Sequence, residues 1–239
     1  MMKAKGNNSI RHTVCMAIML AIMLVSAHSS ASAQAHYNSK FSIGGHAGIT
    51  MSKMSFTPSV KESMVMGNMA GVQLRYWEER NFGLLVEINY EQRGWKEDFE
   101  EYPFSFERKL DYIQVPLLTN IFFGGKHVNG FFNLGPEFGY MIGTSYSANF
   151  NVHDIANIPD FPPNRETDQL WMEPTKKFDY GISAGAGIEF IIKRRHRIHL
   201  EGRYYFGIGN IFPDERKDTF SASRGTSIMV TLGYSYRIK

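Results

Sequence analysis

The sequence predicts an all-β fold, an eight-stranded antiparallel up-and-down transmembrane β-barrel. Three observations predict it: apolar and polar residues alternate with period two almost everywhere beyond residue 40, long and short connections alternate along the chain, and the chain begins with a secretory signal. Period-two alternation marks strands with one apolar and one polar face. Long loops that alternate with short turns are typical of barrels in the bacterial outer membrane.

The first 33 residues have the three parts of a signal peptide. A positively charged region up to Arg11 precedes an apolar run at residues 14–25 and a small-residue cleavage site at residues 31–33. The apolar run is shorter than the roughly 20 residues that a spanning helix needs. We therefore expect residues 1–33 to be removed and residues 34–239 to form one barrel domain of the outer membrane.

Removal of the signal changes the charge and the cysteine count. The whole chain holds 26 Lys+Arg and 23 Asp+Glu, and the signal contains three bases and no acid, so 26 − 3 = 23 bases balance 23 acids. A neutral mature chain removes most of the compositional argument for a nucleic-acid partner. The only cysteine, Cys15, leaves with the signal, which excludes disulfides, a cysteine nucleophile and thiolate metal ligands.

The first four strands are predicted from apolar residues at every second position. Residues 41–52 carry Phe41, Ile43, Ala47, Ile49 and Met51. Residues 70–76 carry Ala70, Val72, Leu74 and Tyr76, and residues 82–91 carry Phe82, Leu84, Val86, Ile88 and Tyr90. Residues 109–123 carry Ile113, Val115, Leu117, Ile121 and Phe123. Each set defines one apolar face.

The last four strands repeat this pattern. Residues 130–143 carry Phe132, Leu134, Phe138, Tyr140 and Ile142. Residues 177–192 carry Phe178, Tyr180, Ile182, Ala184, Ala186, Ile188 and Phe190, and residues 197–207 carry Ile198, Leu200, Tyr204 and Phe206. Residues 226–239 carry Ile228, Val230, Leu232, Tyr234, Tyr236 and Ile238.

The connections between these strands alternate in length. The long ones are residues 53–66, 94–108, 144–176 and 208–225, and the short ones are residues 79–81, 124–129 and the basic cluster at 193–197. In outer-membrane barrels the short turns lie in the periplasm and the long loops lie outside. We therefore interpret the basic cluster as a periplasmic turn, not as a nucleic-acid patch, and place both termini at the same end.

The polar face decides between a membrane barrel and a soluble barrel of lipocalin type, which would put its apolar face inward. Aromatic residues lie near the strand ends of the apolar face, as in membrane-interface girdles: Tyr76, Tyr90, Phe123, Tyr140, Phe178, Tyr180, Phe206 and Tyr236. The polar positions near strand middles are predicted to form a network inside the barrel: Gln73, Arg75, Glu87, Gln114, Glu137, Glu189, Glu201 and Arg203. Side chains can fill an eight-stranded barrel, so we expect a plugged interior.

Four stretches resemble a known family: "LLVEINYEQRG" (84–94), "LDYIQVPLLTNIFF" (110–123), "FFNLGPEFGYMIG" (131–143) and "YGISAGAGIEF" (180–190). They are similar to the PorT-like outer-membrane β-barrel family of Gram-negative bacteria. The second stretch is the most specific, since it contains Pro116, and proline is normally excluded from a central ladder position. The family more often has Glu and Lys where this chain has Gln114 and Asn120. The resemblance implies an outer-membrane barrel, and a secretion role tied to one member is not carried over.

Two hairpins bring interior charges face to face. The hairpin of the second and third strands sets Gln73 opposite Glu87. The hairpin around the basic turn sets Glu189 opposite Glu201, or, in a register two residues different, opposite His199. Facing carboxylates would suit acid-base chemistry, but packed ion pairs are the favoured interpretation for a small barrel.

No motif predicts a catalytic or metal site. Ser42 and His46 share a strand face but are about 13 Å apart at about 3.3 Å per residue, too far for a nucleophile and its base. His153, Asp154 and Asp160 lack the spacing of a metal site. We expect no enzyme activity, no metal and no cofactor.

The long loops are the better candidates for function. Exposed aromatics among charged residues are typical of binding surfaces, although such residues can equally pack together as a cap. The loop candidates are Trp95, Phe99, Tyr102, Phe104, Phe161 and Trp171. We expect a monomer that contacts outer-membrane lipid and acts through its loops, as a structural or adhesive module or with envelope or secretion proteins. A lipid-modifying enzyme, a small-solute channel and a soluble lipocalin-like carrier remain alternatives.

Overall fold

The computed structural model describes residues 40–77, 81–100, 102–163, 165–216 and 218–238, and the predicted signal at 1–33 lies outside them. The strands of this part of the chain are β1 (Lys40–Thr57), β2 (Glu62–Ser63), β3 (Val65–Trp77), β4 (Phe82–Glu97), β5 (Phe106–Gly124), β6 (Val128–Ala148), β7 (Phe178–Ile192), β8 (His196–Gly207) and β9 (Ala222–Arg237). A 3-10 turn, η2 (Ile155–Asn157), and a short helix, α2 (Asp168–Trp171), lie between β6 and β7. Among the residues described, no helix has the length and apolar character to cross a membrane.

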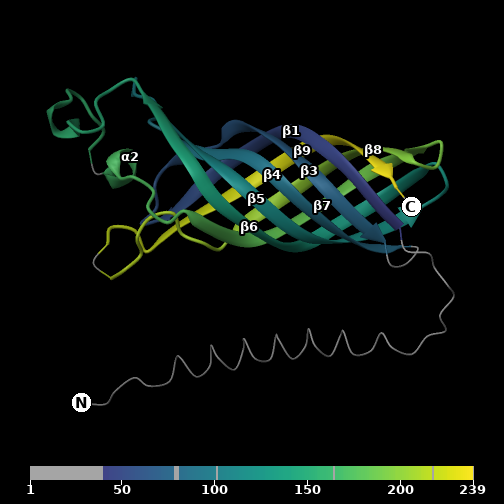
Figure 1. Ribbon diagram of the computed structural model, residues 1–239. Helices are drawn as coiled ribbons and strands as arrows, with labels where there is room; N and C mark the ends of the chain where they lie inside the picture. The colour runs from purple at the N-terminus through teal and green to yellow at the C-terminus, as the bar shows by residue number, and fades with distance from the viewer. Residues whose placement is uncertain (1–39, 78–80, 101, 164, 217, 239) are drawn as a thin grey trace, which may run out of the picture. The chain divides into compact units, whose positions relative to one another are not determined.

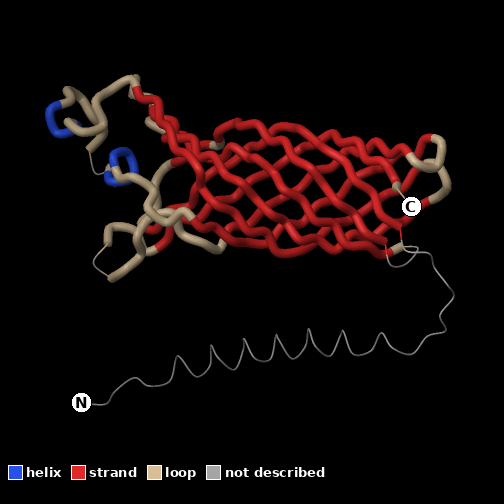
Figure 2. Tube along the Cα trace, viewed as in Figure 1, coloured by secondary structure: helices blue, strands red, loops and turns tan. Residues whose placement is uncertain are grey.

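Eight long antiparallel strands close into a ring. From β3 the ring runs through β1, β9, β8, β7, β6, β5 and β4 and returns to β3. The strands run obliquely around the resulting cylinder, as Figures 1 and 2 show. The ninth strand, β2, adds two residues against the end of β4. The predicted eight-stranded up-and-down barrel is therefore confirmed, with β2 as a short addition before β3.

The two ends of the barrel differ as predicted from the connection lengths. The chain enters β1 and leaves β9 at one end, the inner end, where the β5–β6 and β7–β8 turns also lie. The connections that contain α2 and residues 208–221 lie at the opposite, outer end. Lys193 and Arg194 have positive φ values of 48° and 63°, and only residues 193–195 connect Ile192 to its partner His196, so the basic cluster is a tight turn.

The apolar side chains face outward. Val72 and Leu232 are 58% and 60% exposed, whereas Thr50 and Ser235, which point to the other face of their strands, are completely buried. All eight predicted girdle aromatics lie on this outer surface, fully or partly exposed. A lipocalin-type barrel would need the opposite arrangement, so the soluble-carrier alternative is wrong.

At the outer end, the apolar and polar residues exchange faces: the inward side chains become apolar and the outward side chains become polar. In β1, Lys53 and Ser55 point outward while Met54 and Phe56 are buried inside. In β4, Trp95 is buried inside while Lys96 is exposed. The strands thus continue beyond the lipid-facing band into water, where apolar residues return to the interior. For this reason much of the long loops predicted at 53–66 and 94–108 is strand.

One interruption of the ladder and one glycine in it have simple causes. The β4–β5 pairing is interrupted between Val86, which opposes Leu117, and Asn89, which opposes Gln114, and Pro116 in this gap has no N–H to donate. In β7, a Cβ on Gly187 would come within 2.5 Å of the Phe131 ring. Glycine there lets a large inward side chain cross the narrow interior.

Candidate functional site

Polar side chains fill the barrel interior at three successive levels. The eight residues predicted for this network all lie inside, and each is at most 5% exposed: Gln73, Arg75, Glu87, Gln114, Glu137, Glu189, Glu201 and Arg203. Six of them form ion pairs or hydrogen bonds with one another or with Arg93. Gln73 and Gln114 stand apart, because their amide nitrogens lack a hydrogen-bond partner among the described residues.

At the inner level, two arginines share one carboxylate. Arg75 Nη1 donates to Glu189 Oε2 at 2.5 Å, and Arg197 donates to Glu189 Oε1. Both guanidinium groups also lie over the ring of Trp77, at 5.5 Å for Arg75 and 4.6 Å for Arg197. Trp77 packs against Phe122, so this cluster closes the interior toward the short turns.

The register of β7 and β8 explains this grouping. Glu189 opposes His199, the second of the two registers expected from the sequence, and not Glu201. The tight turn fixes this register by setting Ile192 opposite His196. In the other hairpin, Gln73 opposes Glu87, as expected.

At the middle level, Arg203 connects two carboxylates. Its terminal nitrogens donate to both oxygens of Glu87 at 2.6 and 2.9 Å, and its Nε donates to Glu201 at 2.9 Å. Asn89 and Asn133 each donate a further hydrogen bond of 2.9 Å, to Glu87 and Glu201 respectively. A bidentate pair with extra donors is the arrangement in which buried charges are best satisfied.

At the outer level, three carboxylates surround one guanidinium. Arg93 donates to Glu91 at 2.9 Å, to Glu137 at 2.7 Å and to Asp179 at 3.0 Å. Its guanidinium carbon lies 3.8 Å from the ring centre of Tyr205, whose hydroxyl donates to Asp179 at 2.8 Å. Arg93 therefore holds together groups from four strands.

Sequence reasoning missed Glu91, Arg93, Asp179 and Arg197 as interior residues. A signal was present, since Glu91 and Arg93 follow Glu87 in steps of two along β4. Glu91 ends the strand predicted at 82–91, and Arg93 lies beyond it, because the outward positions after Tyr90 are no longer apolar and the alternation no longer marks a strand.

An aromatic cluster closes the interior above Arg93. The Trp95 ring lies 5.4 Å from Phe56 and 6.3 Å from Phe212, in edge-to-face contacts, and Phe106 and Phe220 belong to the same cluster. Trp95 is fully buried in β4. Its prediction as a loop residue is therefore wrong, because β4 continues beyond Tyr90 with the same alternation of inward and outward side chains, and Trp95 lies on the inward face.

The other loop candidates divide into a cap and an exposed group. Phe99 and Phe104 pack with Phe161 at centroid distances of 6.0 and 5.2 Å, which joins the connection after β4 to the connection after β6. These three rings form a cap of the kind considered as an alternative to a binding surface. Tyr102 and Trp171 remain 39% and 46% exposed.

The connection with α2 is fixed to the barrel rim. Arg108 donates to the carbonyl oxygens of Leu170 at 3.1 Å and Met172 at 2.5 Å. Glu97 accepts from Arg165 at 2.5 Å and from Gln169 at 3.1 Å. Buried charged groups thus anchor both sides of α2.

Two acids outside the membrane-spanning strands have shifted pKa values. Burial raises the pKa of Glu62 to about 7; nearby Lys53 lowers it, and Glu97, directly opposite, raises it. Hydrogen bonds from Lys176 and Asn210 lower the pKa of Asp214. Glu62 is thus partly protonated near neutral pH, while Asp214 stays ionised beside Lys176.

The residues considered for catalysis lie in the barrel interior, and those considered for metal binding lie in the β6–β7 connection. Ser42 and His46 lie inside the barrel on β1, and neither the Ser42 hydroxyl nor the His46 ring nitrogens have a hydrogen-bond partner within the described ranges. Asp154 accepts a hydrogen bond from Asn157. In the part of the chain that the structure describes, no three His, Cys, Asp or Glu side chains could hold a metal ion.

Three solved structures are similar to this chain to different extents. OprG from Pseudomonas aeruginosa is 12% identical, covers 87% of this chain and 99% of its own, and superposes with a TM-score of 0.50, which shows a common fold. Neisserial surface protein A is 11% identical, with coverages of 84% and 99% and a TM-score of 0.45. Outer membrane protein W of E. coli is 14% identical, with coverages of 83% and 98% and a TM-score of 0.43. No curated protein matches this chain.

The family assignment rests on a match to more than half of the chain. The family model described as outer membrane protein beta-barrel domain matches residues 30–213, which include β1 to β8. Its description agrees with the outward apolar face, the polar interior and the alternation of loops and turns. This chain is an outer-membrane protein that belongs to the outer membrane protein beta-barrel domain family.

Proposed function

We propose that this protein is a PorT-like barrel that serves as a structural and binding module of the outer membrane, or as an accessory to an envelope or secretion complex, through its external loops. It acts as a monomer and contacts lipid through its apolar surface. It neither conducts solutes nor catalyses a reaction. The four family-like stretches, in β4, β5, β6 and β7, support the PorT-like assignment.

The burial of the interior charges carries this proposal. A continuous aqueous pore would expose the side chains that line it, whereas the eight predicted interior residues are at most 5% exposed. Aromatic clusters around Trp77 at the inner end and Trp95 at the outer end add to this filling. The surface open to partners is the set of outer loops, where Tyr102 and Trp171 are exposed.

Planar bilayers test the absence of conduction. Purified protein is expected to insert without producing unitary current steps, because the ion pairs of Arg75, Arg93 and Arg203 fill the interior. Gel mobility with and without boiling is the control that the inserted protein is folded. Reproducible steps whose frequency rises with the amount of folded protein would contradict the proposal and favour a small-solute channel.

A further inference from the structure

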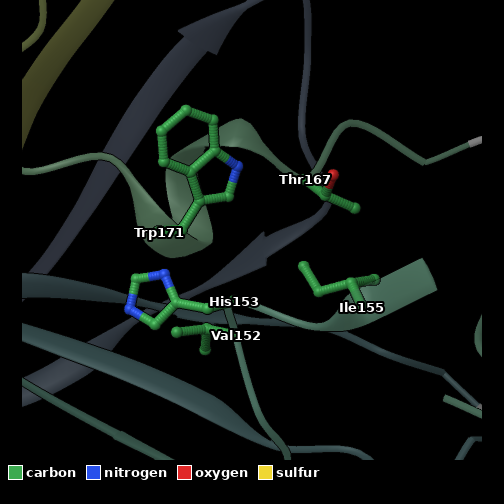
Figure 3. A pocket seen from close by; sticks show the side chains of 5 residues that line it. All are labelled: Val152, His153, Ile155, Thr167 and Trp171. Carbon is green, nitrogen blue, oxygen red and sulfur yellow. The ribbon is translucent and has the colours of Figure 1, made fainter. Parts of the chain in front are cut away.

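An open pocket lies in the connection between β6 and β7. It has a volume of about 310 Å³ and is lined by Val152, His153, Ile155, Thr167 and Trp171. Figure 3 shows Trp171 and His153 on one side of the pocket, with Thr167 and Ile155 on the other. This volume is at the low end of the roughly 300–1,000 Å³ typical of small-molecule sites, which suits a ligand of one or two rings.

The walls of the pocket are held in place by the rest of the loop. On one side, Leu170 is completely buried beside Trp171, and Arg108 binds the Leu170 carbonyl oxygen. Beside Trp171, the backbone N–H of His153 donates to Asn151 Oδ1 at 3.1 Å. A site that is already in its binding conformation loses less entropy when a ligand binds.

The side chains of the pocket combine a flat aromatic surface with polar hydrogen-bonding groups. Trp171 is 46% exposed although Gln169 and Leu170 in the same helix are fully buried. The His153 imidazole and the Thr167 hydroxyl can each exchange hydrogen bonds with a ligand. The five lining residues include no Asp, Glu, Lys or Arg, so a charged ligand would find no partner for its charge.

We propose that this pocket binds a neutral sugar ring of a glycan. One face of the ring stacks its C–H groups on the Trp171 indole, and ring hydroxyls bond to His153 and Thr167. A purely apolar ligand would leave these two polar groups without partners when it displaced water. The inference rests on the proposed function, since it names the ligand class of the outer loops.

Calorimetric titration of the folded protein tests the proposal. The probes are neutral trisaccharides of glucose, galactose or mannose, and vesicles with and without a lipid that carries a neutral hexose headgroup. Saturable binding of at least one probe is expected. Binding of a soluble trisaccharide identifies a free glycan as the source, whereas binding only to hexose-bearing vesicles identifies a membrane glycolipid.

Variants locate the site. Trp171→Ala is expected to weaken binding on the order of tenfold, about 1.4 kcal/mol, because it removes the flat surface on which the sugar ring stacks. Trp171→Tyr retains an aromatic face and should bind more tightly than Trp171→Ala. Tyr102→Ala, which removes the other exposed loop candidate, is the matched control and should bind like the original protein.

Three results would overturn the sugar assignment. The first is that the folded protein binds none of the probes, and the second is that the original protein and Trp171→Ala bind a probe equally well. The third is that a tetraalkylammonium ion binds at Trp171 and no sugar displaces it. None of these three results changes the outcome expected in the planar-bilayer experiment. A barrel that is silent in bilayers and binds no sugar therefore rejects only the pocket assignment, whereas a conducting barrel rejects the proposed function.

Discussion

Arg93→Met is expected to destabilise the barrel by about 3–5 kcal/mol, the usual cost of removing one partner from a buried ion pair. The variant leaves Glu91, Glu137 and Asp179 around a site with no guanidinium. Carboxylates this close in a buried interior repel one another and lose their main hydrogen-bond donor. The cation–π contact with Tyr205 is lost as well.

Urea unfolding in lipid vesicles measures this effect. Arg195→Met is the control, because Arg195 is exposed in the β7–β8 turn and its replacement should leave the unfolding midpoint unchanged. Adding Glu91→Gln and Glu137→Gln to Arg93→Met should recover part of the lost stability, since the unpaired charges are removed. If Arg93→Met unfolds at the same urea concentration as the original protein, the outer-level network does not stabilise the fold.

Leu232→Arg is expected to cost about 2–4 kcal/mol in the free energy of folding into a bilayer. Leu232 is exposed at the middle of the outward run from Ile228 to Tyr236. A guanidinium at this position would have to leave water for the hydrocarbon core. On a water-soluble barrel, the same change at an exposed position would alter stability by less than about 0.5 kcal/mol.

The matched control for Leu232→Arg is Ser147→Arg. Ser147 is exposed at the outer end of β6 and opposes Glu107, so a new arginine there meets water and an acidic neighbour. Folding yield and unfolding midpoint in vesicles should be unchanged for Ser147→Arg and reduced for Leu232→Arg. Equal behaviour of the two variants would mean that lipid does not surround the middle of β9.

The lipid-facing part of each strand was predictable because one face is apolar and the other polar along its whole length. The strand ends at the outer side were not. There, Trp95 turns inward and Lys96 outward, so the pattern has the same period but the opposite phase. A prediction based on one apolar face ends the strand where this exchange begins. For this reason the predicted strand is shorter than β4 and does not include Arg93.

The cap and the pocket depend on contacts that no local spacing contains. Phe99 meets Phe161, and Glu97 meets Arg165, across more than sixty residues of sequence. Composition indicated that aromatics gather in the loops, but only the fold decides which of them are buried. It buries Phe99 and leaves Trp171 exposed at the pocket.

The central claim is that the apolar face of the barrel contacts lipid and that side chains fill the interior. The accessibility of spin labels to oxygen and nickel reagents in membranes tests this claim most directly. Single cysteines would be labelled at the outward positions Val230, Leu232 and Tyr234, at the inward position Thr231, and at Tyr102 in an outer loop. The three outward labels are expected to collide with oxygen but not with a polar nickel reagent. The label at Thr231 should be reached by neither reagent, and the label at Tyr102 should be readily reached by nickel. Nickel access at Val230 and Leu232, or free access of either reagent at Thr231, would contradict this claim.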